Sequence, residues 1–448
     1  MQADLESLTA ALLDAARRAG AEQADALAVA GRSVSIDVRG GRLEQADSAE
    51  GVDLGLRVLI DGRQACVSSS STRADTLAEM AERAVAMAKD APRDPHVGLA
   101  DPADLAADRD AGRLELEDPA ADPDPADLQA LAERAEAAAA AVAGVSQVES
   151  ASASFSRRRL FMAASNGFAG GYGRSGHAVS TIAITGQGTA MERDMAAEGR
   201  VFAADLPAPE AIGQLAGDRA VARAGARKAP TGAFPVLFDE RISAGLIGHL
   251  LAAVNGLAIA RGASWLREAL DQPVLPTGLD LFEDPHRARR TGSRPFDAEG
   301  LATRPRHILR DGRLMGWTLD LATARKLGMT STASAARGTG SAPAPSVSNV
   351  ALTQGAASRD DLIRDMGTGL IVTSFLGASI NATTGDYSRG AAGFWVENGQ
   401  IAYAVNETTI AGNLRDMLMR LTPANDARTH LSQVVPSLLV EGLTLAGA

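Results

Sequence analysis

Histidine and cysteine, the side chains best suited to metal binding and acid–base chemistry, are few in this chain of 448 residues. It contains six histidines and one cysteine, Cys66. A zinc site built from several thiolates of one chain is therefore impossible, and so is an internal disulfide. Five histidines show no spacing typical of a metal site, and we assign them no role. They are His96, His177, His286, His307 and His430. The sixth, His249, lies in an apolar run.

The apolar run spans residues 242–260, contains no charged residue, and is bracketed by Arg241 and Arg261. It reaches the length of about 20 residues that a membrane span needs. Alanine, glycine, serine and asparagine dilute it, however, so we expect a buried helix and no membrane span. A lone histidine on such a helix is more often a core residue than a ligand. The alternative is that His249 lines a channel.

A second polar group interrupts an apolar, glycine-rich region near the C-terminus. It contains Thr384, Gly385, Asp386, Tyr387 and Arg389, and Asn413 follows further along the chain. Loops that carry mixed polar groups on a rigid scaffold are frequent binding elements. Thr-Gly-Asp is also good turn chemistry, so an ordinary hairpin is the alternative. We predict that these residues line a substrate channel or a subunit interface.

Nucleotide and nucleic-acid binding are disfavoured. The glycine pairs at 338–340 and 367–369 are not followed by the Lys-Ser/Thr of a phosphate-binding loop. The formal net charge is −11, and the densest basic run is 157–159. Because binding to a phosphate backbone needs clustered cations, we expect no nucleic-acid partner. The start of the chain lacks the basic region and apolar core of a secretory signal, and one cysteine suits a reducing compartment, so we expect a cytoplasmic protein.

Hydrophobic periodicity predicts the elements that position these residues. Helices are expected near 5–16, 77–87, 128–142, 209–224, 359–366 and 414–421, and strands near 34–38, 52–60, 65–67, 148–202 and 234–238. Asp61-Gly62 and Asn166-Gly167 predict hairpin turns. Residues 68–72 offer N-cap side chains for the helix that follows them. From residue 278 onward, short strands separated by glycine-rich turns are expected.

The chain exceeds the size at which a single hydrophobic core usually stops growing. A connection rich in Asp, Pro and Ala spans about 90–125, and a boundary is expected at 228–232. We therefore predict an α+β fold in two halves, each mixing helices with mostly antiparallel sheet. The halves are an N-terminal α+β domain over 1–228 and a β-rich C-terminal domain over 229–448.

Five blocks of the C-terminal half resemble the TldD/PmbA family, and within it the PmbA (TldE) branch. The longest block, 377–399, includes the polar group at 384–389. The others are 292–300, 324–328, 345–349 and 406–414. The resemblance is strong from about 234 to 426 and looser in the N-terminal half.

The resemblance implies a subunit of a two-subunit zinc metalloprotease that degrades or processes unfolded peptides inside a closed chamber. The TldD-type subunit carries a helix motif His-Glu-x-x-x-His, and a cysteine from a later strand completes its zinc site. In this chain His249 matches the first histidine, whereas Leu250 and Val254 stand at the other two positions. The strand reads Arg389-Gly-Ala-Ala where the cysteine is expected. Leucine and valine have no lone pairs to donate, and one donor is too few for a zinc site.

We therefore predict that this chain holds no cofactor, that a TldD-type partner holds zinc, and that the two form a heterodimer. The chain would complete the chamber and be inactive alone. One alternative is a homodimer that binds peptides, or regulates, without cleaving them. Another is direct action on DNA gyrase or DNA, which the family's older description as a gyrase modulator suggests. The negative net charge argues against direct binding to DNA.

Overall fold

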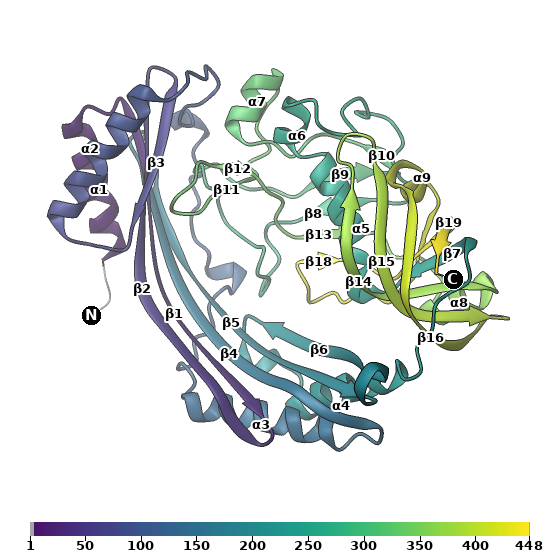
Figure 1. The fold of residues 1–448 in the computed structure, drawn as a ribbon. Helices are drawn as coiled ribbons and strands as arrows, with labels where there is room; N and C mark the ends of the chain where they lie inside the picture. The colour runs from purple at the N-terminus through teal and green to yellow at the C-terminus, as the bar shows by residue number, and fades with distance from the viewer. Residues whose placement is uncertain (1–3, 448) are drawn as a thin grey trace.

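The computed structural model describes residues 4–447. The N-terminal half is built on one long curved sheet, and the C-terminal half is a more compact group of sheets and helices on the concave side of that sheet (Figure 1). The fold is α+β, as predicted. Strand pairing is mostly antiparallel, and within the described residues β7–β14 and β13–β18 are the parallel pairs.

The N-terminal half contains helices α1 (Leu5–Ala19), α2 (Ala74–Asp90), α3 (Pro125–Ala140) and α4 (Pro209–Ala222). Its sheet has the order β3-β2-β1-β4-β5-β6. The strands are β1 (Gln23–Arg39), β2 (Arg42–Ile60), β3 (Arg63–Ser69), β4 (Val145–Ala164), β5 (Ala169–Thr185) and β6 (Glu192–Arg200). Between α2 and α3 the chain has two short 3-10 turns, η1 (Pro102–Asp104) and η2 (Gly112–Leu114).

The four helices cover the same face of the long sheet. Ala24, Ala26 and Ala28 of β1 belong to a core cluster with α1 and α2. Val34 and Ile36 belong to a second cluster with α3 and α4. Because side chains alternate across a strand, these even-numbered residues point to one face. Odd-numbered side chains of β1 therefore point to the concave face, toward the C-terminal half (Figure 1).

Turn chemistry explains how the long strands are joined. Asp61 and Gly62 both have positive φ, 47° and 67°, as a primed two-residue turn requires. The turn between β4 and β5 has Gly167 at φ 93°. Both predicted hairpins are confirmed.

The predicted cap of α2 is wrong. Its N-cap is Arg73, which makes no side-chain cap bond. The hydroxyl of Ser71 is instead engaged with Thr76 Oγ1 at 3.1 Å. The helix therefore begins after the run of hydroxyl residues and not within it.

The C-terminal half contains helices α5 (Glu240–Ala253), α6 (Gly256–Ala260), α7 (Leu321–Leu327), α8 (Arg359–Met366) and α9 (Leu414–Met419). One sheet has the order β16-β15-β14-β7-β19-β17, with β16 also pairing with β19. Its strands are β7 (Gly232–Phe238), β14 (Gly369–Ile380), β15 (Asp386–Glu397), β16 (Gln400–Asn413), β17 (Leu421–Pro423) and β19 (Leu438–Ala446).

A second sheet of this half has the order β10-β9-β8-β13-β18, and β11 pairs with β12 in a small ribbon. The strands are β8 (Leu281–Glu283), β9 (Arg306–Arg310), β10 (Arg313–Leu314), β11 (Ala335–Ala336), β12 (Ala344–Pro345), β13 (Val350–Leu352) and β18 (Gln433–Val434). One large hydrophobic core connects these elements and includes the buried side chains of Trp265, Trp317 and Trp395.

The apolar run 242–260 is not one helix, so that prediction is wrong. It divides at Asn255, whose backbone is extended and whose side-chain oxygen accepts a hydrogen bond from the Leu257 amide at 3.0 Å. The side-chain nitrogen of Asn255 donates to the Pro345 carbonyl at 2.8 Å. The asparagine therefore ends α5 and caps α6. Between residues 4 and 447, no helix combines the length and the hydropathy that crossing a membrane requires.

Candidate functional site

Helix α5 follows β7 directly and lies against β14. Its N-cap is Asp239, whose carboxylate accepts a hydrogen bond from the Arg241 amide at 3.2 Å. The Asp239 amide donates to the Val372 carbonyl of β14 at 3.0 Å. The helix axis is therefore tied at its first turn to the strands that form the central sheet of the C-terminal half.

His249 lies on α5 opposite β15. Its ring is 5.9 Å from the ring of Tyr387, in an edge-to-face arrangement. Its Nε2 atom is buried and has no hydrogen-bond partner among the described residues. Burial lowers the pKa of His249, and the nearby Arg389 guanidinium lowers it further. The imidazole is therefore neutral at pH 7.

The residues around His249 do not fit a catalytic metal ion. Leu250 and Val254 are fully buried members of the hydrophobic core. The polar side chains of β15 that lie beside His249 are the phenol of Tyr387 and the guanidinium of Arg389. Across residues 4–447, no three His, Cys, Asp or Glu side chains gather closely enough to hold a metal ion.

Tyr387 and Arg389 form a polar pair beside His249. The Tyr387 side chain is buried, and this burial raises the pKa of its phenol. Arg389 Nε donates to the Gly377 carbonyl at 3.1 Å. Its guanidinium lies over the Phe375 ring, 4.0 Å from the centroid. The cation is therefore held in place by the strand opposite its own.

The other predicted residues gather in one tight turn. Thr384 Oγ1 donates to Asp386 Oδ2 at 2.6 Å. Asn413 Nδ2 donates to the Thr384 carbonyl and to Asp386 Oδ1, both at 3.1 Å. Gly385 has φ 84°, and a Cβ there would lie 3.4 Å from the Trp265 ring. This turn favours glycine because of its positive φ and tight packing.

The predicted set therefore divides into two groups. Tyr387 and Arg389 lie with His249, whereas Thr384, Gly385, Asp386 and Asn413 stabilise the turn between β14 and β15. The role of either group in a substrate channel or a subunit interface stays a prediction.

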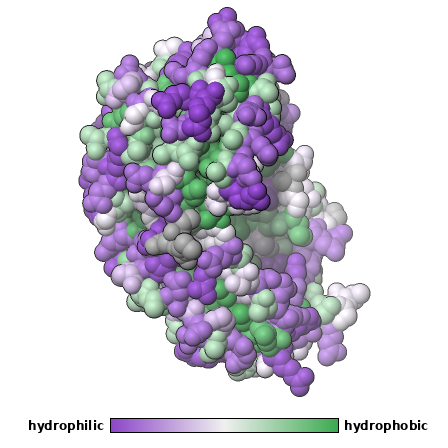
Figure 2. Space-filling model, turned by 90° about the vertical axis from the view of Figure 1, so that its left-hand side faces the viewer, coloured by the Kyte–Doolittle hydropathy of each residue, from purple (hydrophilic) through white to green (hydrophobic). Residues whose placement is uncertain are grey.

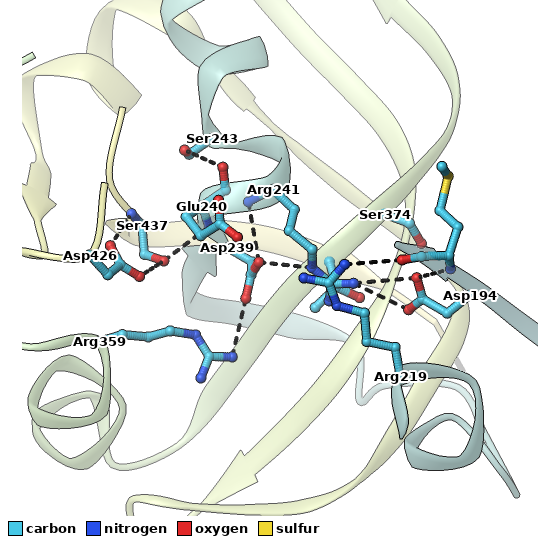
Figure 3. Close-up of polar contacts among 12 residues, drawn as sticks. Asp194, Arg219, Asp239, Glu240, Arg241, Ser243, Arg359, Ser374, Asp426 and Ser437 are labelled. Carbon is cyan, nitrogen blue, oxygen red and sulfur yellow. Dashed lines mark hydrogen bonds and ion pairs between the residues drawn. The ribbon is translucent and has the colours of Figure 1, made fainter. Parts of the chain in front are cut away.

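A network of charged side chains from both halves of the chain holds the start of α5 (Figure 3). Arg241 lies 3.0 Å from Asp239 and 3.3 Å from Asp194 of β6. Asp194 also lies 3.5 Å from Arg223, at the end of α4. Arg359, the first residue of α8, contacts Asp239 at 3.2 Å. The N-terminal half is thereby joined by ion pairs to the helix that carries the candidate site.

The same network reaches strand β14, because Arg223 Nη1 donates to Ser374 Oγ at 3.1 Å. Glu240 is engaged on the other side, where its amide donates to Ser437 Oγ at 3.0 Å. Burial raises the pKa of the Glu240 carboxyl, although Arg428 opposes this effect. Sequence reasoning missed the network, because its contacts join residues far apart in the chain and no local pattern marks them.

The chain matches the PmbA/TldA metallopeptidase family over three consecutive segments. These are domain 1 at residues 24–88, the central domain at 118–224 and the C-terminal domain at 231–447. The chain therefore belongs to the PmbA/TldA metallopeptidase family.

Two curated relatives are similar over nearly the whole chain. Metalloprotease PmbA of Escherichia coli O157:H7 is 36% identical over 417 residues, which cover 92% of this chain and 90% of that protein. The Metalloprotease PmbA homolog of Haemophilus influenzae is 35% identical over 451 residues, covering 99% of this chain and 96% of that protein. Within the family, these similarities support assignment to the PmbA/TldE branch.

Solved structures share the fold. A Bacteroides thetaiotaomicron protein described as a modulator of DNA gyrase superposes with a TM-score of 0.90 at 27% identity, covering 100% of both chains. TldE from Thermococcus kodakarensis gives a TM-score of 0.84 at 18% identity, covering 98% of this chain and 100% of that one. The second likeness is one of fold alone.

Proposed function

We propose that this chain is the zinc-free subunit of a heterodimeric TldD/TldE-type metalloprotease in the cytoplasm. It completes the chamber of a TldD-type partner and contributes to the binding of unfolded peptides, while the partner supplies zinc. Membership of the PmbA/TldE branch is the starting point. The observation that carries the proposal is that α5 presents one donor, His249, where a zinc protease needs a full ligand set.

The chemistry of the neighbouring side chains supports a zinc-free site. A catalytic zinc ion takes three protein ligands and an open position for water, and it works with a general base. Leu250 and Val254 offer hydrocarbon only, and both are committed to the core. Arg389 places a positive charge beside His249. A divalent cation at this place would be repelled by the guanidinium and held by a single imidazole.

Peptide binding is supported by a free sheet edge beside α5. Strand β14 pairs with β7 only at residues 370–372. On that side, residues 373–380 meet no other strand of the described chain, and α5 packs against β14. An extended peptide can add to such an edge through main-chain hydrogen bonds, which makes binding tolerant of sequence.

The test is elemental analysis for zinc on this chain alone, on a TldD-type partner alone, and on the mixed pair, together with cleavage of an unfolded peptide. We expect zinc with the partner and with the pair, and chelator-sensitive cleavage only after mixing. Stoichiometric zinc in this chain alone, with cleavage by the chain alone, would overturn the proposal. Binding of the peptide by the mixed pair without cleavage would favour the alternative, a homodimeric peptide-binding or regulatory protein. Size-exclusion chromatography of the chain alone then tests whether it forms a homodimer.

A further inference from the structure

Strand β2 carries a long sheet edge that the chain itself leaves uncovered. Strand β1 pairs with β2 along residues 42–59, whereas β3 pairs with it only from residue 54 to residue 60. Residues 42–53 therefore have no strand on their second side within the part of the chain that the structure describes. Residues 42–51 are all exposed. About half of the main-chain N–H and C=O groups of such a segment point toward the open side.

The charges of this edge are one-sided. It carries one arginine and four acids, Arg42, Glu44, Asp47, Glu50 and Asp53, and it has neither lysine nor proline. Register with β1 places Asp47 opposite Ser35 and Glu50 opposite Arg32. Because Ser35 and Arg32 point to opposite faces of the sheet, acids lie on both faces of the edge. Any strand that pairs here must accommodate carboxylates above and below the sheet.

These charges select between two kinds of partner. Each edge has a net charge of −3, from one arginine and four acids, so two copies of it would repel each other. A strand with Lys or Arg would instead form opposite-charge pairs with the same positions. Exposed sheet edges are normally protected against unwanted pairing, and acids serve that purpose against self-association.

The face beside this edge, on the side of α1 and α2, is mostly hydrophilic. Figure 2 views the molecule from the side of α1 and α2, and hydrophilic residues dominate this face, with hydrophobic ones in a narrow, interrupted band. A partner on this side would therefore depend mainly on main-chain hydrogen bonds and charge.

We propose that residues 42–53 of β2 are the docking edge for a lysine- or arginine-bearing strand of a different subunit. The added strand would extend the long sheet and its concave face beyond β2. This inference rests on the proposed function in one respect, namely that the chain assembles with a partner that is not a second copy of itself.

The experiment uses the full chain and three synthetic peptides of about ten residues, a length typical of long strands. One alternates valine and lysine, one alternates valine and glutamate, and one is the lysine peptide with two central valines replaced by proline. Binding is measured by fluorescence anisotropy in about 50 mM salt, where exposed charges are screened less than at physiological ionic strength. The protein variants are Asp47→Lys with Glu50→Lys, and Glu79→Lys with Glu82→Lys on the exposed surface of α2 as a control of the same charge change.

We expect the lysine peptide to bind about tenfold more tightly than the glutamate peptide, since several cross-strand ion pairs each contribute. Proline should abolish this binding, because it removes main-chain donors. The Asp47→Lys, Glu50→Lys variant should bind the lysine peptide about tenfold more weakly and the Glu79→Lys, Glu82→Lys variant should not, with circular dichroism confirming that both variants fold. Equal binding of the proline peptide, or no effect of the Asp47→Lys, Glu50→Lys variant, would overturn the inference.

The proposed function has its own readout, so the two failures differ. If mixing with a TldD-type protein produces peptide cleavage and the Asp47→Lys, Glu50→Lys variant cleaves equally well, the proposed function stands and this docking edge is wrong.

Discussion

Asp194→Asn tests how the two halves of the chain are joined. The Asp194 carboxylate is 10% exposed and lies 3.3 Å from Arg241 and 3.5 Å from Arg223. Each guanidinium keeps a second carboxylate, because Asp239 lies 3.0 Å from Arg241 and Glu192 lies 3.7 Å from Arg223. Removing one partner of a buried ion pair costs about 3–5 kcal/mol when nothing replaces it. With these remaining partners, we expect the free energy of unfolding to fall by about 2–3 kcal/mol.

The chain offers a probe for each half. Its three tryptophans, Trp265, Trp317 and Trp395, all lie in the C-terminal half, whereas far-UV circular dichroism reports both halves. In urea, we expect the two signals to change together in the unsubstituted protein. In Asp194→Asn the circular dichroism transition should begin at lower urea, because the N-terminal half loses its direct ion pair with α5. Asp14→Asn, in an exposed pair on α1, should leave both curves unchanged. Coincident curves with an unchanged midpoint in Asp194→Asn would refute the reasoning.

Further substitutions test the buried features. Leu250→Glu places a carboxyl in the core and should lower the free energy of unfolding by about 3–5 kcal/mol without creating zinc binding. Urea titration measures the stability and elemental analysis measures zinc. Bound zinc would contradict the conclusion that the residues around His249 do not fit a metal ion. Gly55→Ala should destabilise the protein strongly, because its Cβ would lie 2.2 Å from the Thr339 carbonyl oxygen, whereas Gly51→Ala on the same strand meets nothing within 4 Å; thermal melts of the two variants should differ clearly. Burial, followed by neighbouring carboxylates, raises the pKa of Glu299 well above its usual value. The folded state therefore favours the protonated acid, and the stability that this carboxyl contributes below its unfolded-state pKa is lost as pH rises through its folded-state pKa. Glu299→Gln imitates the protonated form, so its stability relative to the parent should grow from acidic to alkaline pH in urea titrations, and a gain that shrinks with rising pH would contradict this sign.

Secondary structure was predictable where a short local residue pattern specifies it. The dipeptide Asp61-Gly62 predicted the hairpin between β2 and β3, and both residues adopt the positive φ that this turn needs. Helix α7 was not predicted, although it is bounded by a capping box at Asp320 and Thr323 and by Gly328 in the left-handed region. It has only 7 residues, too few to show helical periodicity.

Other features depended on distant contacts and could not be predicted. The break between α5 and α6 at Asn255 is held by a hydrogen bond from its side chain to Pro345, 90 residues away. Asp194 and Arg241 are 47 residues apart, and neither stands in a distinctive local pattern. Sequence reasoning could name candidate residues, whose role in a site stays a prediction, but it could not predict their grouping. Only the fold separates Arg389 beside His249 from the turn at Asp386.

The long sheet has a consequence for dividing this protein into modules. Family domain 1 at 24–88 contains β1, and the central domain at 118–224 contains β4. These two strands are neighbours in one sheet and pair from Asp25 opposite Ala164 to Val38 opposite Ala151. Truncation between the two segments would remove the pairing partner of β1 along most of its length, and β4 would lose its partner β1. The two family domains are therefore parts of one folding unit, and a fragment for expression should include all six strands of this sheet.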